Sequence, residues 1–180
     1  GQSGMRVIVV ERGRVGGEAS SAAAGMLAPL AEAEREDDFF NLTTAGLAMY
    51  SDFARELKAS SGVDIEYRYV RTPYLALTDE DEEELERRWR RHRATESNVK
   101  RLNAGCALKL EPLLNGSLRF ALKFPGDHQV DNRRLMTALM TAAQNAGVEF
   151  RTHTEARELS IEKIAGRNRI IGVMTACGEV

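Results

Sequence analysis

The chain has 180 residues, a formal net charge of −2 and a hydrophobic share of 43%. This length predicts one domain or a domain and a half, and the composition suffices for a real core. The charge gives no reason to bind nucleic acid or an anionic membrane, and no apolar run approaches the roughly 20 residues of a membrane span. We therefore expect neither partner, and the lack of a signal peptide points to the cytoplasm.

The first feature is an apolar run at residues 5–11, MRVIVVE, which ends in an acid. A short β-branched run of this kind predicts a strand that is buried on both faces of a parallel sheet. It is followed by GRVGG and by residues 18–32, EASSAAAGMLAPLAE, where mostly tiny side chains fill positions 19–26. Two explanations stay open: a closely packed helix start or Ala-rich turn, or a backbone that must come close to a phosphate-bearing ligand.

Residues 36–61 carry apolar side chains at three- and four-residue steps, which predicts a helix that ends before Gly62. Strands are expected next at residues 64–70 and 73–78, with a break at the Thr72-Pro73 dipeptide between them. The middle of the chain therefore starts with a long helix and continues with β-structure.

Residues 78–97, TDEDEEELERRWRRHRATES, change from acidic to basic along their length. Acids in the first turns and arginines near the end suit the helix dipole, and Thr78 or Asp79 can cap the helix. An RNA-binding arginine cluster is the alternative, but it ignores the acids. We therefore predict a solvated helix with internal ion pairs and no partner.

The second half of the chain alternates between helices and strands. The expected elements are a short helix at residues 105–114, a strand at 116–124, a helix at 132–147 capped by Asp131 and ended by Gly147, and strands at 148–153, 156–159 and 169–176. The apolar face of the last helix is predicted to be core and comprises Leu135, Met136, Leu139, Met140 and Ala143. The order of elements predicts a mixed α/β fold class.

Cysteine and histidine provide no sign of a metal site. The two cysteines, Cys106 and Cys177, have no metal-type spacing and are expected to be free thiols. The three histidines, His92, His128 and His153, lie far apart in the sequence and form no ligand cluster. We therefore expect no bound metal ion.

Glu11 stands at the carboxyl end of the first predicted strand, and ligands bind at that edge of a parallel sheet. In a dinucleotide-binding βαβ unit, an acid at this place accepts hydrogen bonds from ribose hydroxyls. The plain alternative is a strand that ends in a solvated glutamate. The glycine-rich phosphate motif should come roughly 20 residues earlier, and the short segment before Glu11 does not contain it. If Glu11 is the ribose acid, we expect the phosphate loop to have been cut away.

Several motifs occur together in a particular order: VVER, GG, SSAAAGML, AE, FF, SGVDIEYR, LEP, DHQVDNRRL and GVEFRTHT. In this order and spacing, along essentially the whole chain, the sequence resembles the glycine oxidases of the FAD-dependent D-amino-acid oxidase family. The resemblance implies an FAD-binding α/β domain, Rossmann-like in part, interleaved with a mixed-sheet substrate domain. It implies oxidation of small amines or amino acids such as glycine and sarcosine, with a role in thiamine biosynthesis.

The resemblance also implies a set of FAD contacts at matching positions. They are Glu11 and Arg12 at the ribose, Ala19 and Ser20 at the pyrophosphate, Ala24, Gly25 and Met26 along the flavin ring, and Ala156 at the adenine. Ala19 lacks the hydroxyl that the family often has there, so only its backbone can make the contact. No catalytic residue is expected within these residues.

The same resemblance divides the chain into domains. Residues 1–35 and 146–180 are expected to belong to the FAD-binding domain, and residues 36–145 to the helices and sheet of the substrate domain. The family's phosphate loop and its C-terminal part, which holds the substrate carboxylate, do not occur in the sequence. We therefore expect an internal fragment that binds FAD weakly or not at all and does not turn over substrate.

An unpaired apolar strand at residues 5–11 predicts a homodimer or a larger homo-oligomer. A second hypothesis about function stays open: a non-catalytic ligand-binding or interaction module derived from the substrate domain. The two hypotheses separate on the flanking sequence, because a G-x-G-x-x-G encoded just upstream in frame would favour the flavoenzyme.

Overall fold

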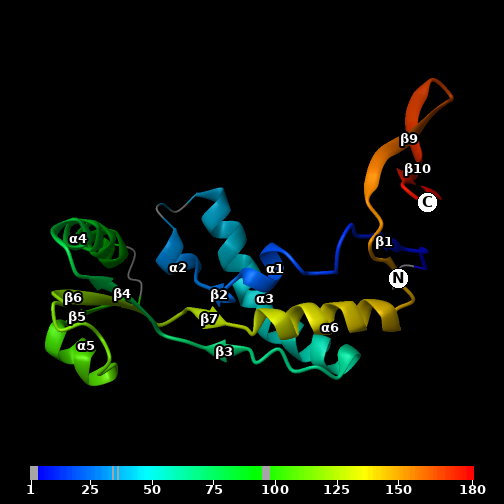
Figure 1. Cartoon of the computed structure of the whole chain (residues 1–180). Helices are drawn as coiled ribbons and strands as arrows, with labels where there is room; N and C mark the ends of the chain where they lie inside the picture. Colours follow the sequence, from blue (N-terminus) through cyan, green and yellow to red (C-terminus); the bar gives the residue numbers. More distant parts are fainter. Residues whose placement is uncertain (1–3, 34, 36, 95–97) are drawn as a thin grey trace. The chain divides into compact units, whose positions relative to one another are not determined.

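The computed structural model describes residues 4–33, 35, 37–94 and 98–180 (Figure 1). The chain divides into two compact units, and each is described by itself. The first lies within Gly1–Ala24, Ala54–Ile65 and Asp131–Val180, and the second within Gly25–Phe53 and Glu66–Val130. Both contain helices and strands, so the mixed α/β class is confirmed. The expected domain division at residues 35 and 145 stays a prediction.

Each unit contains helices and strands from more than one segment of the chain (Figure 1). The first unit contains β1 (Ile8–Val10), α1 (Ala19–Ala22), the last part of α3 (Asp38–Ser61), α6 (Asn132–Asn145), β8 (Glu149–Arg151), β9 (Ala156–Ile164), β10 (Arg167–Thr175) and β11 (Gly178–Glu179). The second unit contains β2 (Met26–Leu27), α2 (Pro29–Glu32), the first part of α3, β3 (Arg68–Tyr69), β4 (Thr72–Ala76), α4 (Asp79–Ala94), β5 (Lys100–Asn103), α5 (Ala104–Leu110), β6 (Phe120–Phe124) and β7 (His128–Gln129).

A pair of parallel strands is the β-structure around which the first unit is arranged. β1 pairs with β8, and Ile8 lies opposite Glu149. The parallel pairing predicted for the first apolar run is therefore confirmed. The predicted burial on both faces is wrong, since the strand is only half-buried and Met5 before it is 66% exposed. The physical reason is that β8 is the only strand beside β1 in the part of the chain that the structure describes.

α6 comes directly before β8 in the chain. Asp131 caps it as predicted, because its carboxylate accepts the backbone N–H of Arg134 at 2.9 Å. The predicted core face is only partly correct. Ala138 is the fully buried residue of the helix, whereas Leu139 keeps 37% of its surface exposed.

β9 and β10 form a long hairpin (Figure 1), and apolar residues lie opposite one another along it. Leu159 lies opposite Val173 and Ile161 lies opposite Ile170, and the register shifts between Ile170 and Gly172. A bulge of this kind adds one residue to one strand. The residue pairs before and after the bulge therefore keep their side chains on the same face of the hairpin. Leu159, Ile161 and Ile170 remain between 49% and 59% exposed. β9 extends beyond the predicted 156–159, and β10 begins two residues before the predicted 169–176 and ends one residue earlier, at Thr175.

The core of the second unit is the three-stranded antiparallel sheet β4-β6-β5. β6 is its central strand, and every residue of it except Lys123 is buried. Leu122 and Phe124 pack in one cluster with Leu85 of α4, and a fully buried side chain of this size contributes about 1.5–3 kcal/mol. The predicted break at Pro73 is wrong, because Pro73 lies inside β4 and faces Lys123. Proline is tolerated there since β4 is an edge strand.

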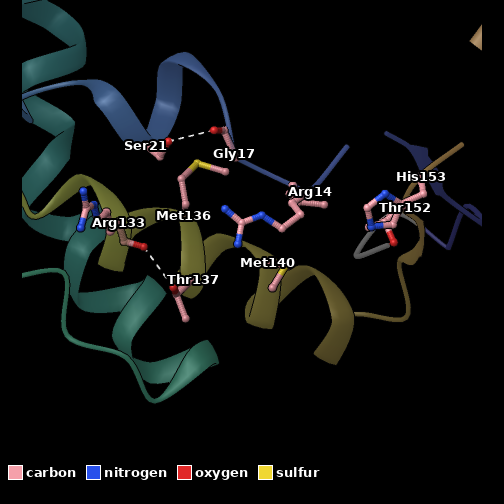
Figure 2. Close-up of a pocket in the computed structure, with 11 residues that line it drawn as sticks. Arg14, Gly17, Ser21, Arg133, Met136, Thr137, Met140, Thr152 and His153 are labelled. Carbon is pink, nitrogen blue, oxygen red and sulfur yellow. Dashed lines mark hydrogen bonds between the residues drawn. The ribbon is translucent and has the colours of Figure 1, made fainter. Parts of the chain in front are cut away.

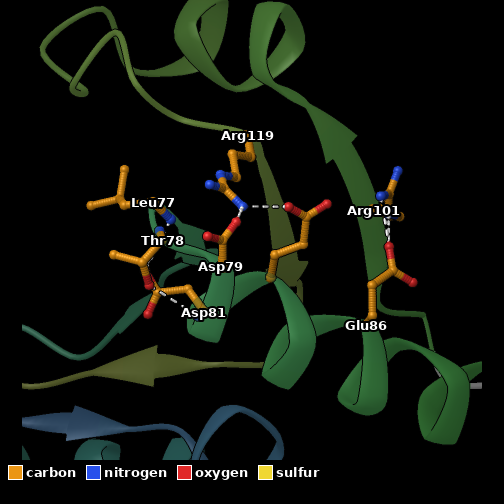
Figure 3. A network of polar contacts seen from close by, with 8 residues as sticks. Leu77, Thr78, Asp79, Asp81, Glu86, Arg101 and Arg119 are labelled. Carbon is orange, nitrogen blue, oxygen red and sulfur yellow. Dashed lines mark hydrogen bonds and ion pairs between the residues drawn. The ribbon is translucent and has the colours of Figure 1, made fainter.

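α4 is a solvated helix with ion pairs, as predicted. Thr78 caps it: the hydroxyl of Thr78 accepts the N–H of Asp81 at 3.1 Å, and the Asp81 carboxylate accepts the N–H of Thr78 at 2.9 Å. These backbone hydrogen bonds, that of Thr78 first, lower the pKa of Asp81. Figure 3 shows Arg119 reaching α4, where it pairs with Asp79 and, at 2.7 Å, with Glu82. The acids of the helix therefore have partners on neighbouring strands and loops.

A second small sheet, β2-β7-β3, carries an aromatic cluster. His128 of β7 lies opposite Leu27 on one side and Tyr69 on the other. The hydroxyl of Tyr67 is 2.5 Å from Nδ1 of His128, and burial is the main cause that raises the pKa of Tyr67 to about 12. Burial also lowers the pKa of His128. Burial thus favours a protonated Tyr67 hydroxyl beside a neutral imidazole.

The described residues contain neither a membrane-spanning helix nor a metal-binding cluster. None of the helices there combines the length and the apolar character that crossing a membrane requires. No group of three or more histidine, cysteine or acidic side chains in the described part is arranged to hold a metal ion. Cys106 and Cys177 are both free and exposed.

Candidate functional site

Glu11 lies immediately after β1, at the carboxyl end of the parallel pair. The N–H of Gly13 donates to Oε1 of Glu11 at 2.7 Å and so orients this carboxylate. The backbone of Glu11 is fixed on both sides, because its N–H donates to Arg151 at 2.9 Å and its carbonyl accepts the N–H of Thr154 at 2.8 Å. A half-buried acid is thus held at the edge of the sheet where α/β folds bind ligands.

Arg12 turns to a neighbouring acid. Its guanidinium donates to Glu18 at 2.6 Å, and both side chains are largely exposed. The hydrogen bond and the charge of Glu18 are the main causes that raise the pKa of Arg12, with smaller effects from Glu11 and Glu155. The arginine expected beside the ribose is therefore already engaged by Glu18 in this structure.

The small-residue stretch forms only one short helix, α1, which contains Ala19 and Ser20. The carbonyl of Ser20 accepts a hydrogen bond from the side-chain amide of Asn132 at the start of α6. The hydroxyl of Ser21 donates back to carbonyls of its own turn. The hydroxyl of Ser20 makes no such bond to any residue that the structure describes, so it is accessible to a ligand.

A cavity of about 390 Å³ lies in the first unit between the loop after Glu11 and α6 (Figure 2). Arg14, Met136 and His153 are among the residues that line it, and Figure 2 shows Arg14 extending over α6 towards Met136. Gly16 has a φ of +69°, and a Cβ on it would lie 2.8 Å from the methyl group of Met136. Only glycine fits this bend of the loop. The sequence indicated the bend through its Gly-Gly pair but gave no sign of the cavity.

The remaining expected contacts are divided between the units. Ala156 opens β9 in the first unit, two residues after Thr154, whose N–H binds Glu11. Ala24 ends the first segment of that unit, and Gly25 begins the second unit. Gly25 has a φ of +76°, a left-handed conformation in which a side chain is strained. Met26 follows in β2, and Val130 donates its N–H to the carbonyl of Gly25 at 2.9 Å.

Met26 leads into a larger cavity of about 570 Å³ in the second unit, here called the α2–α3 pocket. It is lined by residues of β2, α2, α3 and the segment between the two helices. Its large apolar and aromatic side chains are Met26, Leu27, Phe39, Phe40, Leu47 and Tyr50. Because a predominantly apolar pocket of this size with a few polar groups is the usual form of a small-molecule site, the α2–α3 pocket is a second candidate site.

A buried acid lies near this pocket. Asp127 has no exposed surface, and neither of its carboxylate oxygens has a hydrogen-bond partner of ordinary geometry among the described residues. Burial raises the pKa of Asp127 to about 6, a polar interaction with Thr72 opposes this rise, and the charge of Glu32 adds to it. Of these causes, the charge of Glu32 comes from a residue that lines the α2–α3 pocket.

Apart from Met26, the sequence did not single out the pocket residues as functional. Phe39 lies on the helical apolar stripe of residues 36–61, a pattern that is usually taken for core. The structure leaves Phe39, Leu42 and Met49 between 69% and 72% exposed, and Leu57 is the buried residue of α3. The available signal was Gly46, a glycine in the middle of a long predicted helix, which often has a packing or functional reason.

The whole chain, residues 1–180, matches the sequence model of the family described as DAO, FAD dependent oxidoreductase. The chain belongs to this FAD-dependent oxidoreductase family. Within the family it is similar to glycine oxidases: it is 35% identical to the glycine oxidase of Geobacillus kaustophilus over 155 residues, or 86% of this chain. That stretch is 41% of the relative, so the chain spans less than half the length of this curated relative.

Two solved structures have the same fold over nearly the entire chain. The crystal structure of glycine oxidase from Geobacillus kaustophilus superposes with a TM-score of 0.87 at 32% identity and covers 99% of this chain. The glycine oxidase of Bacillus cereus ATCC 14579 superposes with a TM-score of 0.88 at 26% identity, again over 99% of this chain. In each case the chain corresponds to 47% of the solved protein.

The residues present fit part of an FAD site. A carboxylate held at the carboxyl end of a parallel strand suits the ribose hydroxyls of a dinucleotide. The accessible Ser20 hydroxyl can donate to a phosphate oxygen, whereas Arg12 is engaged by Glu18. At Gly25 the backbone is left-handed and carries no Cβ, which lets a flat group come close. Glu11 and Ser20 are therefore the residues of the first unit that would hold the cofactor, and Gly25, in the second unit, stays a predicted contact.

Proposed function

We propose that this chain forms part of the cofactor site and of the substrate site of an FAD-dependent oxidase that acts on small amines or amino acids. The observation that carries the proposal is the oriented carboxylate of Glu11 at the end of a parallel strand, in a chain that matches the family over its full length. FAD, when bound, accepts the hydride that leaves the substrate carbon. The chain's own residues bind and orient the cofactor and enclose the substrate.

Each of these tasks has a residue. Glu11 accepts hydrogen bonds from the ribose hydroxyls, and Gly13 keeps its carboxylate in place for them. Ser20 offers a hydroxyl donor to the pyrophosphate. Gly25 lets the backbone approach the flavin ring, and Ala156 uses its backbone at the adenine. Met26, which follows Gly25 in the chain, lines the α2–α3 pocket, whose apolar walls would exclude water from a bound substrate.

Glycine oxidation and a place in thiamine biosynthesis belong to the proposal through the similarity to the curated glycine oxidases. A substrate carboxylate needs a cation, and the arginine in the α2–α3 pocket is paired with Asp37 at 2.9 Å. Arg35 is therefore engaged by Asp37 and is not assigned to that carboxylate. The present chain contributes the amine side of the substrate site.

A non-catalytic binding module is the competing function. The α2–α3 pocket gives it some support, because a closed set of lining residues can bind a small molecule without flavin. The two functions differ in what Glu11 does, since a binding module has no use for an oriented acid at the end of β1.

A chimera tests the proposal. Residues 5–180 of this chain replace the matching 47% of the Geobacillus kaustophilus glycine oxidase, which supplies the phosphate loop and the remaining substrate contacts. The chimera is expected to release hydrogen peroxide with glycine, sarcosine or an apolar amine. A folded chimera that holds FAD but oxidises none of these amines would favour the binding module.

A further inference from the structure

The walls of the α2–α3 pocket are unusually apolar for a site that takes glycine. Three aromatic side chains line it, Phe39, Phe40 and Tyr50, together with Met26 and Leu47. Phe40 and Tyr50 are half-buried, whereas Phe39 and Met26 lie more open at the rim, 72% and 47% exposed. Glycine carries no side chain that could use these walls. The pocket therefore has room and apolar surface for a substituent that glycine lacks.

A glycine in the middle of a helix opens this pocket. Gly46 lies in α3 and lines the cavity, and a Cβ built on it meets no other heavy atom within 4 Å. A glycine in a helix interior lowers helix stability relative to alanine or leucine, and here it leaves space where a side chain would stand. Gly46 thus lowers the stability of the helix and leaves the cavity larger.

The charges of the pocket favour a cation. Three charged residues line it, and two of them neutralise each other, because Arg35 donates to Asp37 at 2.9 Å. The third is Glu32, whose carboxylate makes no ion pair or hydrogen bond within the described residues. Arg88 and Arg91 donate to the main-chain carbonyls of Ala31 and Ala33, on either side of Glu32, and Arg88 also pairs with Glu84. Glu32 is therefore the lining charge that is left for a ligand.

From these features we infer that the α2–α3 pocket binds the ammonium group of an amine through Glu32 and holds an apolar or aromatic substituent of that amine between Phe40 and Tyr50. A cation near aromatic faces gains from the ring quadrupoles as well as from the carboxylate. The catalytic meaning of this inference rests on the proposed function. For that function it names the substrate class, which is amines with a bulky apolar group.

Binding can be measured on the chain itself, without flavin. The six methionines are labelled with ¹³C at the methyl group, and 2-phenylethylammonium is titrated while their NMR signals are followed. Met26 lines the α2–α3 pocket, whereas Met136 and Met140 line the other cavity and serve as internal controls. A saturable shift of the Met26 signal alone is the expected result. No shift of Met26 at tens of millimolar ligand would overturn the inference.

Two control ligands separate the parts of the inference. The neutral 2-phenylethanol keeps the ring and loses the charge, and methylammonium keeps the charge and loses the ring. Both ligands are expected to bind the α2–α3 pocket more weakly than 2-phenylethylammonium does, as measured by the shift of the Met26 signal. Equal affinity of the alcohol would show that Glu32 plays no part, and equal affinity of methylammonium would show that the aromatic walls play none.

Variants provide the second arm. Glu32→Gln should weaken binding of 2-phenylethylammonium about threefold or more and leave 2-phenylethanol unchanged, since an exposed charge pair is of modest strength. Gly46→Leu should fill the pocket and remove the Met26 shift while it raises the melting temperature of the chain. Ala48→Leu, on the same helix outside the pocket, is the matched control and should bind normally. Normal binding by Gly46→Leu would contradict the inference.

The outcome is independent of that of the chimera. If the Met26 shift is seen but the chimera oxidises no amine, the proposed function fails and the binding site stands. If the chimera oxidises glycine and the Met26 shift is missing, the function stands and the inference about the apolar amine fails.

Discussion

The N–H of Gly13 holds Oε1 of Glu11 at 2.7 Å, at the end of a parallel strand. This contact orients one carboxylate oxygen before any ligand arrives, which lowers the cost of ordering the group on binding. The sequence predicts that Glu11 is the acid that binds the ribose, and this geometry suits that role.

Glu11→Gln in the chimera should weaken FAD binding by about tenfold, because a hydrogen bond to a charged group is worth about 1.5 kcal/mol or more. Glu18→Gln is the matched control, since Glu18 is exposed and binds Arg12 rather than a ligand. The dissociation constants follow from quenching of FAD fluorescence. Equal affinities of the wild type and Glu11→Gln would exclude Glu11 from the cofactor site.

Gly25 and Ala156 should respond differently to the same substitution. Gly25→Val in the chimera should abolish FAD binding, because φ at +76° strains any side chain and a side chain there also occupies the space of the ring. Ala156→Val should change FAD binding little, since this exposed strand position uses only its backbone. FAD content after purification measures both. Equal loss in the two variants would show that the placement of these residues is wrong.

Asp127 should make the stability of the chain depend on pH. Its pKa in the folded chain is about 6, above the ordinary 3.8, so between these values the folded state binds the proton more tightly than the unfolded state. The free energy of unfolding should therefore fall as pH rises from 4 to 6, by about 1–3 kcal/mol, and then level off. Urea unfolding at a series of pH values measures this. In Asp127→Asn the fall should disappear, and the variant should be the more stable one at pH 8.

Asp127→Asn keeps the size of the side chain, so a cavity does not complicate the comparison. Asp131→Asn is a control, because this acid caps α6 on its surface. An unchanged pH profile in Asp127→Asn would mean that other groups control the stability in this range.

The chain should associate through β1. This strand has β8 on one edge and no strand on the other among the described residues, and Met5 beside it is 66% exposed. An unpaired apolar edge pairs readily with a second copy, and a two-fold dimer is the simplest closed arrangement. Sedimentation at micromolar concentration should show a homodimer or larger assembly, and Met5→Lys should shift it towards the monomer. A clean monomer of the wild type would contradict this prediction.

Local sequence signals predicted much of the fold. Asp131 caps α6, Thr78 caps α4, and Gly62 follows α3 with a φ of +73° and its N–H bound to Lys58. Such signals act within one turn of the backbone, so they are visible in the sequence. The parallel pairing of the first strand was also predictable, because a continuous β-branched run that ends in an acid is typical of it.

Burial was less predictable, because it depends on which elements meet. The apolar stripe that includes Phe39 and Met49 on α3 has a helical period typical of core, but these side chains are exposed. Pro73 signals a break, yet it lies in β4 since that strand forms an edge. The two cavities combine residues far apart in the sequence or on one face of a helix, and no motif announces them. For the same reason Glu32 and Gly46 were not identified in advance.

The visible absorption spectrum of the purified chimera, before and after anaerobic addition of an amine, tests the central claim most directly. If this chain supplies the ribose acid and the flavin-facing backbone of an amine oxidase, the folded chimera shows flavin bands that bleach when glycine, sarcosine or 2-phenylethylamine is added. A chimera that is folded, as judged by circular dichroism, but has no flavin bands would contradict the claim. So would bands that none of the three amines bleaches.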